Sequence, residues 1–459
     1  MKYLKIICSC LIMSSLLLTG CGNNSNQGPS KVQEFGDIDN SELDSSSKNS
    51  EDTNSENTNL PYYDATNLVE AKAYSTDDKL QEKSSYYKEQ LTARQKRAFD
   101  AIYNAASNMT GNIEFESSQF VTPSELKNIM NIIFLDCPEI FYLNNNYSYV
   151  VNSEGYATSV SLDFGKTAEQ IATIKSSLAQ QKPGYLENRK NNDYETIQKL
   201  LKDIDLSRYE SVSIDANGNY NFSVCDPFDE LTMGKNSIGA SKLFCYWLRQ
   251  LGIDSTVVVG EIVSNDLQDT YELTTDYLKY CNEYQVSDNE YKVEFNYSYY
   301  WLWNVVKIDD NWYNLDIMYS LLLNQKDKAI SKTSLWFVPD RTMSQSRLFY
   351  MNEEILGISP SCTDINFEQS YREGNYILPH TETQMVLRIK QELASIDQEN
   401  KESVYFQFED EDSFNYFLDN FDDQVDYYNN TYGNAIGLYE IHACRDALSI
   451  AITNIINNY

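Results

Sequence analysis

One stretch of the chain, residues 237–319, constrains the fold more than any other. Its first part has apolar residues at helical spacing, which make one face: Ala240, Leu243, Phe244, Trp247, Leu248 and Leu251. Gly252 stops this helix, and a β-rich run follows over 255–263. Two further β-rich runs, 299–308 and 312–319, flank the turn residues Asp309, Asp310 and Asn311. The stretch therefore predicts a helix, a strand and a β-hairpin in that order.

This order resembles the transglutaminase-like superfamily, whose core is papain-like. In that family a helix begins Cys-x-Gly-Tyr-Ala and ends before Gly-Ile, and later strands carry His-Ala-Trp-Asn and Trp-Tyr-x-x-Asp. The matching residues here are Gly239, Ala240, Gly252, Ile253, Trp303, Asn304, Trp312, Tyr313 and Asp316, although Ala240 stands where the family has tyrosine. The resemblance covers roughly 195–325, and the segment Pro-Glu-Ile-Phe-Tyr-Leu at 138–143 is similar to what precedes such domains. It implies an α+β fold with a papain-like core.

The resemblance also implies a Cys-His-Asp triad, and two of its three positions carry other residues. The nucleophile position is Ser237, the base position is Trp301, and the orienting position is Asp316. An indole donates its N–H and offers no acceptor, so Trp301 cannot take a proton. Serine without a base is a poor nucleophile. We therefore expect a catalytically degenerate domain, with a cleft that would be lined by Gly239, Trp303, Asn304 and Trp312.

Other residues are weak substitutes for the missing triad members. The histidines, His380 and His442, both follow the triad region. We expect His380 to lie in a surface connection and His442, which sits in a strand pattern, to be structural. Cys245 lies more than two helical turns past Ser237, so we expect it to pack. Cys225 stays open on geometry, but it also lacks an imidazole partner.

Three functional hypotheses remain. The first is a non-catalytic protein that binds a peptide, a protein or a cell-wall ligand. The second is an acyl-transfer or hydrolytic enzyme in which Ser237 and Asp316 work with Tyr299 or Tyr300. The third is a spacer in a surface assembly. In the first and third, Ser237 caps its helix, and Asp316 bonds backbone or the indole N–H of Trp301.

The N-terminus predicts export and anchoring. Lys2 and Lys5 precede an apolar run at 6–18, which is too short to span a bilayer and has signal-peptide length. It ends in Leu-Thr-Gly-Cys, which resembles the lipobox of bacterial lipoproteins and implies a diacylglyceryl group on Cys21. An ordinary secretory signal with a chance cysteine is the alternative. We expect an extracytoplasmic protein, held to the membrane by its lipid, with a signal at 1–20 and a polar tether at 21–61.

The net charge and the cysteine spacing limit the classes of partner and ligand that we expect. The net charge of −32 argues against nucleic acid as a partner. The cysteines outside the signal and lipid site include no CxxC pair, so we expect no metal site and no cofactor. Their disulfide pairing stays open: Cys137, Cys225, Cys245, Cys281, Cys362 and Cys444.

Three folded domains are expected: α/β over 62–192, transglutaminase-like over 193–340, and α+β over 341–459. Capping boxes open helices at Thr92, Thr122, Thr167 and Thr381. The helix that begins at Thr167, in the first domain, is expected to end at Pro183 and Gly184. The acidic segment 264–296 is a lid, a partner-binding insertion or a solvated excursion, with a helix possible over 271–284.

Overall fold

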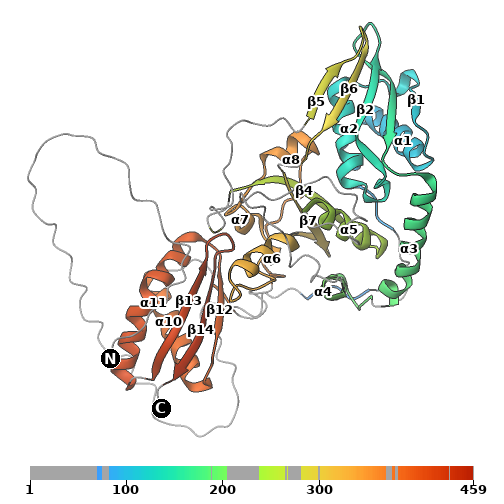
Figure 1. The fold of residues 1–459 in the computed structure, drawn as a ribbon. Helices are drawn as coiled ribbons and strands as arrows, with labels where there is room; N and C mark the ends of the chain where they lie inside the picture. Colours follow the sequence, from blue (N-terminus) through green and yellow to red (C-terminus); the bar gives the residue numbers. More distant parts are fainter. Residues whose placement is uncertain are drawn as a thin grey trace, which may run out of the picture.

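The computed structural model describes residues 70–74, 82–187, 189–203, 237–263, 266, 281–297, 300–368, 375–377, 381–433 and 435–457. These residues form a mixed helix and sheet structure of the α+β class, with three sheets arranged one after another across the molecule (Figure 1). The expected signal, tether and lipid site at Cys21 lie outside the described residues. None of the described helices is long and apolar enough to cross a membrane.

The first sheet joins residues from both sides of the expected boundary at 192. Its order is β1-β3-β2-β6-β5, and β6 pairs antiparallel with β2. The strands are β1 (Asn112–Glu114), β2 (Leu143–Val151), β3 (Ala157–Phe164), β5 (Cys281–Gln285) and β6 (Glu290–Phe295). The end of the acidic segment is therefore a hairpin that extends the N-terminal sheet, and 281–284 is strand rather than helix. The rest of the expected helix, 271–280, lies outside the described residues.

Capping boxes predicted where the N-terminal helices begin. Thr92 with Gln95 caps α1 (Ala93–Ser107), and Thr122 with Glu125 caps α2 (Pro123–Asp136). The expected end of the next helix at Pro183 is wrong, because α3 (Ala168–Glu187) continues through it. A proline in a helix removes one backbone hydrogen bond. In the same turn, the side chain of Lys182 donates to Glu82 and Gln250.

The 3-10 helices are η3 (Tyr87–Gln90), η4 (Ser117–Gln119) and η5 (Pro138–Ile140).

The central sheet has the order β10-β4-β7-β8-β9, and α5 packs against β4 and β7. Its strands are β4 (Ser255–Ile262), β7 (Trp301–Ile308), β8 (Asn311–Leu315), β9 (Trp336–Val338) and β10 (Arg347–Leu348). The helices nearby are α4 (Asp193–Asp203), α5 (Ser237–Gln250), α6 (Ile317–Lys326), α7 (Asp340–Met343) and α8 (Tyr350–Ile355). The predicted helix, strand and hairpin are present, but the expected β run over 312–319 is wrong at its end, because β8 stops at Leu315 and Asp316 caps helix α6. Because β10 belongs to this sheet, its core continues past residue 340 to Phe367, and it also includes Cys444 and Ala447 from the C-terminal part of the chain.

Residues 375–457 form what we call the C-terminal layer, a sheet with two helices on one face (Figure 1). The sheet order is β11-β12-β14-β13. The elements are β11 (Tyr376–Ile377), α10 (Glu382–Glu399), β12 (Val404–Phe408), α11 (Glu411–Tyr432), β13 (Ile436–Cys444) and β14 (Ser449–Asn457). This layer has a hydrophobic core of its own, from Ile377 to Ile455. The sequence predicts a helix from Thr381, a strand over 403–408, a helix near 413–421 and strands over 438–444 and 447–455. This order is confirmed, and the helix after β12 is longer than its apolar pattern indicated.

Candidate functional site

Asp316, to which the family resemblance assigns the orienting position of a triad, lies at the junction between β8 and α6. Its Oδ1 accepts a hydrogen bond of 3.0 Å from the backbone N–H of Tyr319, so the residue caps α6. Aspartate is among the best residues for this position, and its charge also interacts favourably with the helix dipole. The side chain is 1% exposed, so this carboxylate is part of the protein interior.

The other carboxylate oxygen of Asp316 has two buried donors. Trp301 Nε1 donates to Asp316 Oδ2 at 2.8 Å, and Arg347 Nη2 lies 2.5 Å from the same oxygen. The side chain of Arg347 is fully buried, and its guanidinium lies 3.8 Å from the ring centroid of Tyr319. An ion pair of this kind supplies the charge neutralisation that a buried carboxylate needs. The guanidinium and the indole thus occupy the oxygen that would orient a histidine.

Ser237 is brought to the same region at the start of α5. It is fully buried, and its Oγ accepts a hydrogen bond of 3.2 Å from the backbone N–H of Leu302. Leu302 follows Trp301 in β7, so the three triad-equivalent residues lie on adjoining elements. No side chain that could act as a base bonds Ser237 Oγ among the residues that the structure describes. The arrangement therefore resembles a packed core more than a reaction site.

The residues expected to line a cleft are mostly internal. Trp303 donates its indole N–H to Asn314 Oδ1 at 2.8 Å, and Asn304 donates to the carbonyl of Ser241 at 2.8 Å. Both are buried, as is Gly239 in the first turn of α5. Trp312 is half-buried on β8, and its ring makes an edge contact with Tyr86, at 5.4 Å between centroids. These residues join strands and helices to one another.

The described histidine lies away from the triad-equivalent residues. His442 Nδ1 lies 2.7 Å from Asp327 Oδ2, and its Nε2 lies 3.0 Å from Thr453 Oγ1. Its role in these contacts is structural, as the strand pattern predicted. His380, Cys225 and Tyr299 lie outside the described residues. Tyr300 is buried at the start of β7.

The described cysteines are buried and make no disulfide with one another: Cys137, Cys245, Cys281, Cys362 and Cys444. Cys245 packs inside α5, with its Sγ 3.5 Å from Ser255 Oγ. Burial raises the pKa of this thiol to about 12, because the thiolate would lose its hydration. The predicted packing role of Cys245 is confirmed.

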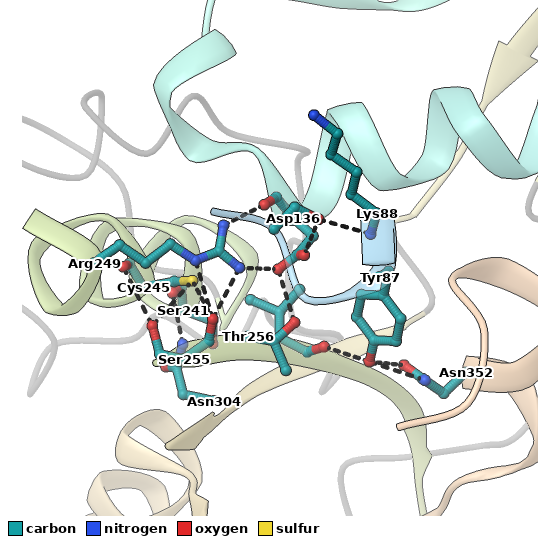
Figure 2. Close-up of polar contacts among 12 residues, drawn as sticks. Tyr87, Lys88, Asp136, Ser241, Cys245, Arg249, Ser255, Thr256, Asn304 and Asn352 are labelled. Carbon is teal, nitrogen blue, oxygen red and sulfur yellow. Dashed lines mark hydrogen bonds and ion pairs between the residues drawn. The ribbon is translucent and has the colours of Figure 1, made fainter. Parts of the chain in front are cut away.

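A second buried ion pair connects the N-terminal helices to the central sheet (Figure 2). Arg249 Nη2 lies 2.6 Å from Asp136 Oδ1, which also accepts from Thr256 Oγ1 at 2.8 Å. Asp136 Oδ2 accepts from Ser85 Oγ at 2.5 Å, and the Arg249 guanidinium also donates to the carbonyl of Ser255. Every hydrogen bond in this cluster joins residues of different elements, so it fixes α2 against α5 and β4.

Sequence reasoning missed Arg347, which is the dominant partner of Asp316. The sequence indicated only that some cation was needed, because a buried aspartate without a histidine partner requires another positive group.

Among the described residues, no group of three or more His, Cys, Asp or Glu side chains is placed to hold a metal ion. No protein-family model matches the chain, and a search of curated proteins finds no match. The site is therefore interpreted from its own geometry.

Proposed function

We propose that this protein is a non-catalytic binding protein of the cell surface, built on a degenerate transglutaminase-like, papain-like core. The observation that carries the proposal is the occupation of the Asp316 carboxylate by Arg347 and Trp301. A catalytic aspartate of this kind orients an imidazole, which must itself exchange a proton with the nucleophile. Here a permanent cation and an indole donor hold that carboxylate, and neither group takes up a proton at neutral pH.

The order and packing of the central elements support the papain-like part of the proposal. The helix that begins at Ser237 packs against β4 and β7, and the hairpin of β7 and β8 leads directly to Asp316. Ser237, Trp301 and Asp316 lie on neighbouring elements, and this supports the proposal. The fold would then be retained after loss of the chemistry.

The ligand class follows from location and composition. An extracytoplasmic protein with lipid on Cys21 meets peptides, proteins and cell-wall polymers. Its 36 tyrosines provide amphipathic contact area of the kind that dominates protein interfaces. The net charge of −32 favours neutral or cationic ligands over nucleic acid.

A pair of matched serine variants tests the absence of catalysis. Ser237 and Ser241 are both buried in α5, and each makes one hydrogen bond with the backbone of Leu302. The amidase, protease and amine-transfer rates of the purified protein would be compared with those of Ser237→Ala and Ser241→Ala. We expect no turnover above background in any of the three proteins. Turnover that Ser237→Ala loses and Ser241→Ala keeps would establish the alternative, an enzyme with a serine nucleophile.

Crosslinking with mass spectrometry on intact cells tests the binding role. We expect the anchored protein to crosslink repeatedly to one peptide, protein or glycan partner, in competition with added excess of the soluble chain. Crosslinks only between copies of this chain would instead support a structural spacer.

A further inference from the structure

Two acidic side chains meet where the C-terminal layer contacts the central core. Asp446 lies in the turn between β13 and β14 and is fully buried, and Asp266 follows β4 and is 7% exposed. The backbone N–H of Asp446 donates to Asp266 Oδ2 at 2.8 Å, and the N–H of Asp266 lies 3.4 Å from Asp446 Oδ2. Residues 180 positions apart thus bond each other's backbone across this interface. Two like charges in a buried contact oppose each other.

The groups around this carboxyl pair come from α6, β10 and β13. Tyr319 of α6 donates its hydroxyl to Asp446 Oδ2 at 2.6 Å, and Lys326 of the same helix acts on Asp266 through its charge. Cys444 of β13 bonds the Asp266 carboxylate. The guanidinium of Arg347 in β10 lies over the ring of Tyr319, where it is paired with Asp316. The interface therefore connects directly to the triad-equivalent region.

Burial and the neighbouring charge make Asp266 the proton acceptor of the pair. Burial, followed by the charge of Asp446, raises the pKa of Asp266 to about 6, against opposing effects of hydrogen bonds and Lys326. The pKa is thus higher in the folded protein than in the unfolded chain. The contribution of this group to stability is fully present below the ordinary pKa of an aspartate, and it is lost as the pH rises through the folded value.

We propose that the Asp266–Asp446 carboxyl pair makes the docking of the C-terminal layer on the central core acid-dependent. A proton on Asp266 removes the repulsion between the two side chains, while the backbone N–H of each residue still bonds the other. Loss of that proton at neutral pH leaves two buried negative charges facing each other, and the layer loosens. The inference does not depend on the proposed binding function.

One other carboxyl group of the same interface titrates in the same direction. Glu368 is buried, and burial, with a further effect from the charge of Glu409, raises its pKa well above the usual range, while Arg341 and Tyr376 oppose this shift. Glu368 is unchanged in variants at position 266, so the difference between the native protein and such a variant isolates the Asp266–Asp446 pair.

Hydrogen exchange on the full chain measures the docking at the interface itself. Protection factors, corrected for intrinsic exchange rates, would be determined at pH 5 and pH 7.5 for peptides that cover α6 and the turn at 444–449. We expect the native protein to lose roughly tenfold in protection between the two pH values, the scale of one pKa unit of differential interaction. Asp266→Asn removes the charge of this side chain. Between pH 5 and pH 7.5, its fold-loss of protection should be at most about one third of the fold-loss in the native protein.

Two further variants make the result decisive. Asp446→Asn removes the other charge and should reduce the pH dependence in the same way. Asp310→Asn alters an exposed aspartate in the turn between β7 and β8, and it should behave like the native protein. Equal protection of the native protein at both pH values would overturn the proposal. So would an Asp266→Asn or Asp446→Asn protein that loses as much protection as the native chain.

Discussion

Arg347 and Asp316 form an ion pair of 2.5 Å in the interior of the central core, with their side chains 0% and 1% exposed. Arg347 lies in β10 at the edge of the sheet, and Asp316 caps the helix that follows β8. The pair therefore joins an edge strand to the opposite half of the sheet. Both groups of this ion pair are part of the packed interior of the central core.

Arg347→Met should destabilise the central core by about 3–5 kcal/mol, because it leaves the Asp316 carboxylate buried without its cation. Urea unfolding would be followed by tryptophan fluorescence for the central core, since all five tryptophans lie between residues 247 and 336, and by far-UV circular dichroism for the whole chain. Arg445→Met is the matched control, because Arg445 pairs with Glu411 at the surface, with side chains 33% and 58% exposed. It should change stability by less than about 1 kcal/mol. Equal effects of the two substitutions would contradict the assigned role of Arg347.

Arg249→Met should have a similar effect, because it leaves Asp136 buried and unpaired between α2 and α5 (Figure 2). We expect a loss of about 3–5 kcal/mol in the same unfolding measurement. Lys83→Met provides the comparison, since Lys83 pairs with Asp254 in a partly exposed contact of 3.2 Å. A loss of less than about 1 kcal/mol is expected there. A small effect of Arg249→Met would show that the N-terminal helices are held by apolar packing alone.

Local signals in the sequence predicted much of the fold. Thr122 and Glu125 are three residues apart and satisfy each other's backbone, so a short motif suffices to place the start of α2. The turn at Asp309 separates two β-rich runs that pair as β7 and β8. The bond from Trp301 to Asp316 also followed from residue chemistry, because a buried indole N–H needs an acceptor.

Contacts between distant segments could not be predicted in this way. The pairing of β6 with β2 joins Lys292 to Ser148, and nothing in the acidic segment itself indicates which sheet edge it meets. The ion pair of Arg347 with Asp316 likewise depends on the path of the chain through α6, α7 and β9. Periodicity and capping report only on neighbours along the chain, whereas these contacts arise from packing.

Thiol reactivity should follow burial. Burial raises the pKa of Cys245 to about 12, and it raises the pKa of Cys137 well above the usual range, so neither forms thiolate in the native protein at pH 8. Cys281 lies at the sheet edge near Lys127, whose charge partly offsets the effect of burial on its pKa. Alkylation at pH 8 followed by peptide mapping should therefore label Cys281 before either of the other two. Rapid labelling of Cys245 in the native protein would show that α5 is not packed as described.

The central claim is that Asp316 serves folding rather than catalysis, and Asp316→Asn tests it with two readouts on one protein. Asparagine has one acceptor oxygen, so it can keep the cap of α6, but it loses the acceptor for the Trp301 indole and the charge that pairs with Arg347. We predict a loss of about 3–5 kcal/mol in stability, with amidase and amine-transfer rates at background in both the native and the variant protein. Unchanged stability, together with a native turnover that the variant loses, would contradict the account.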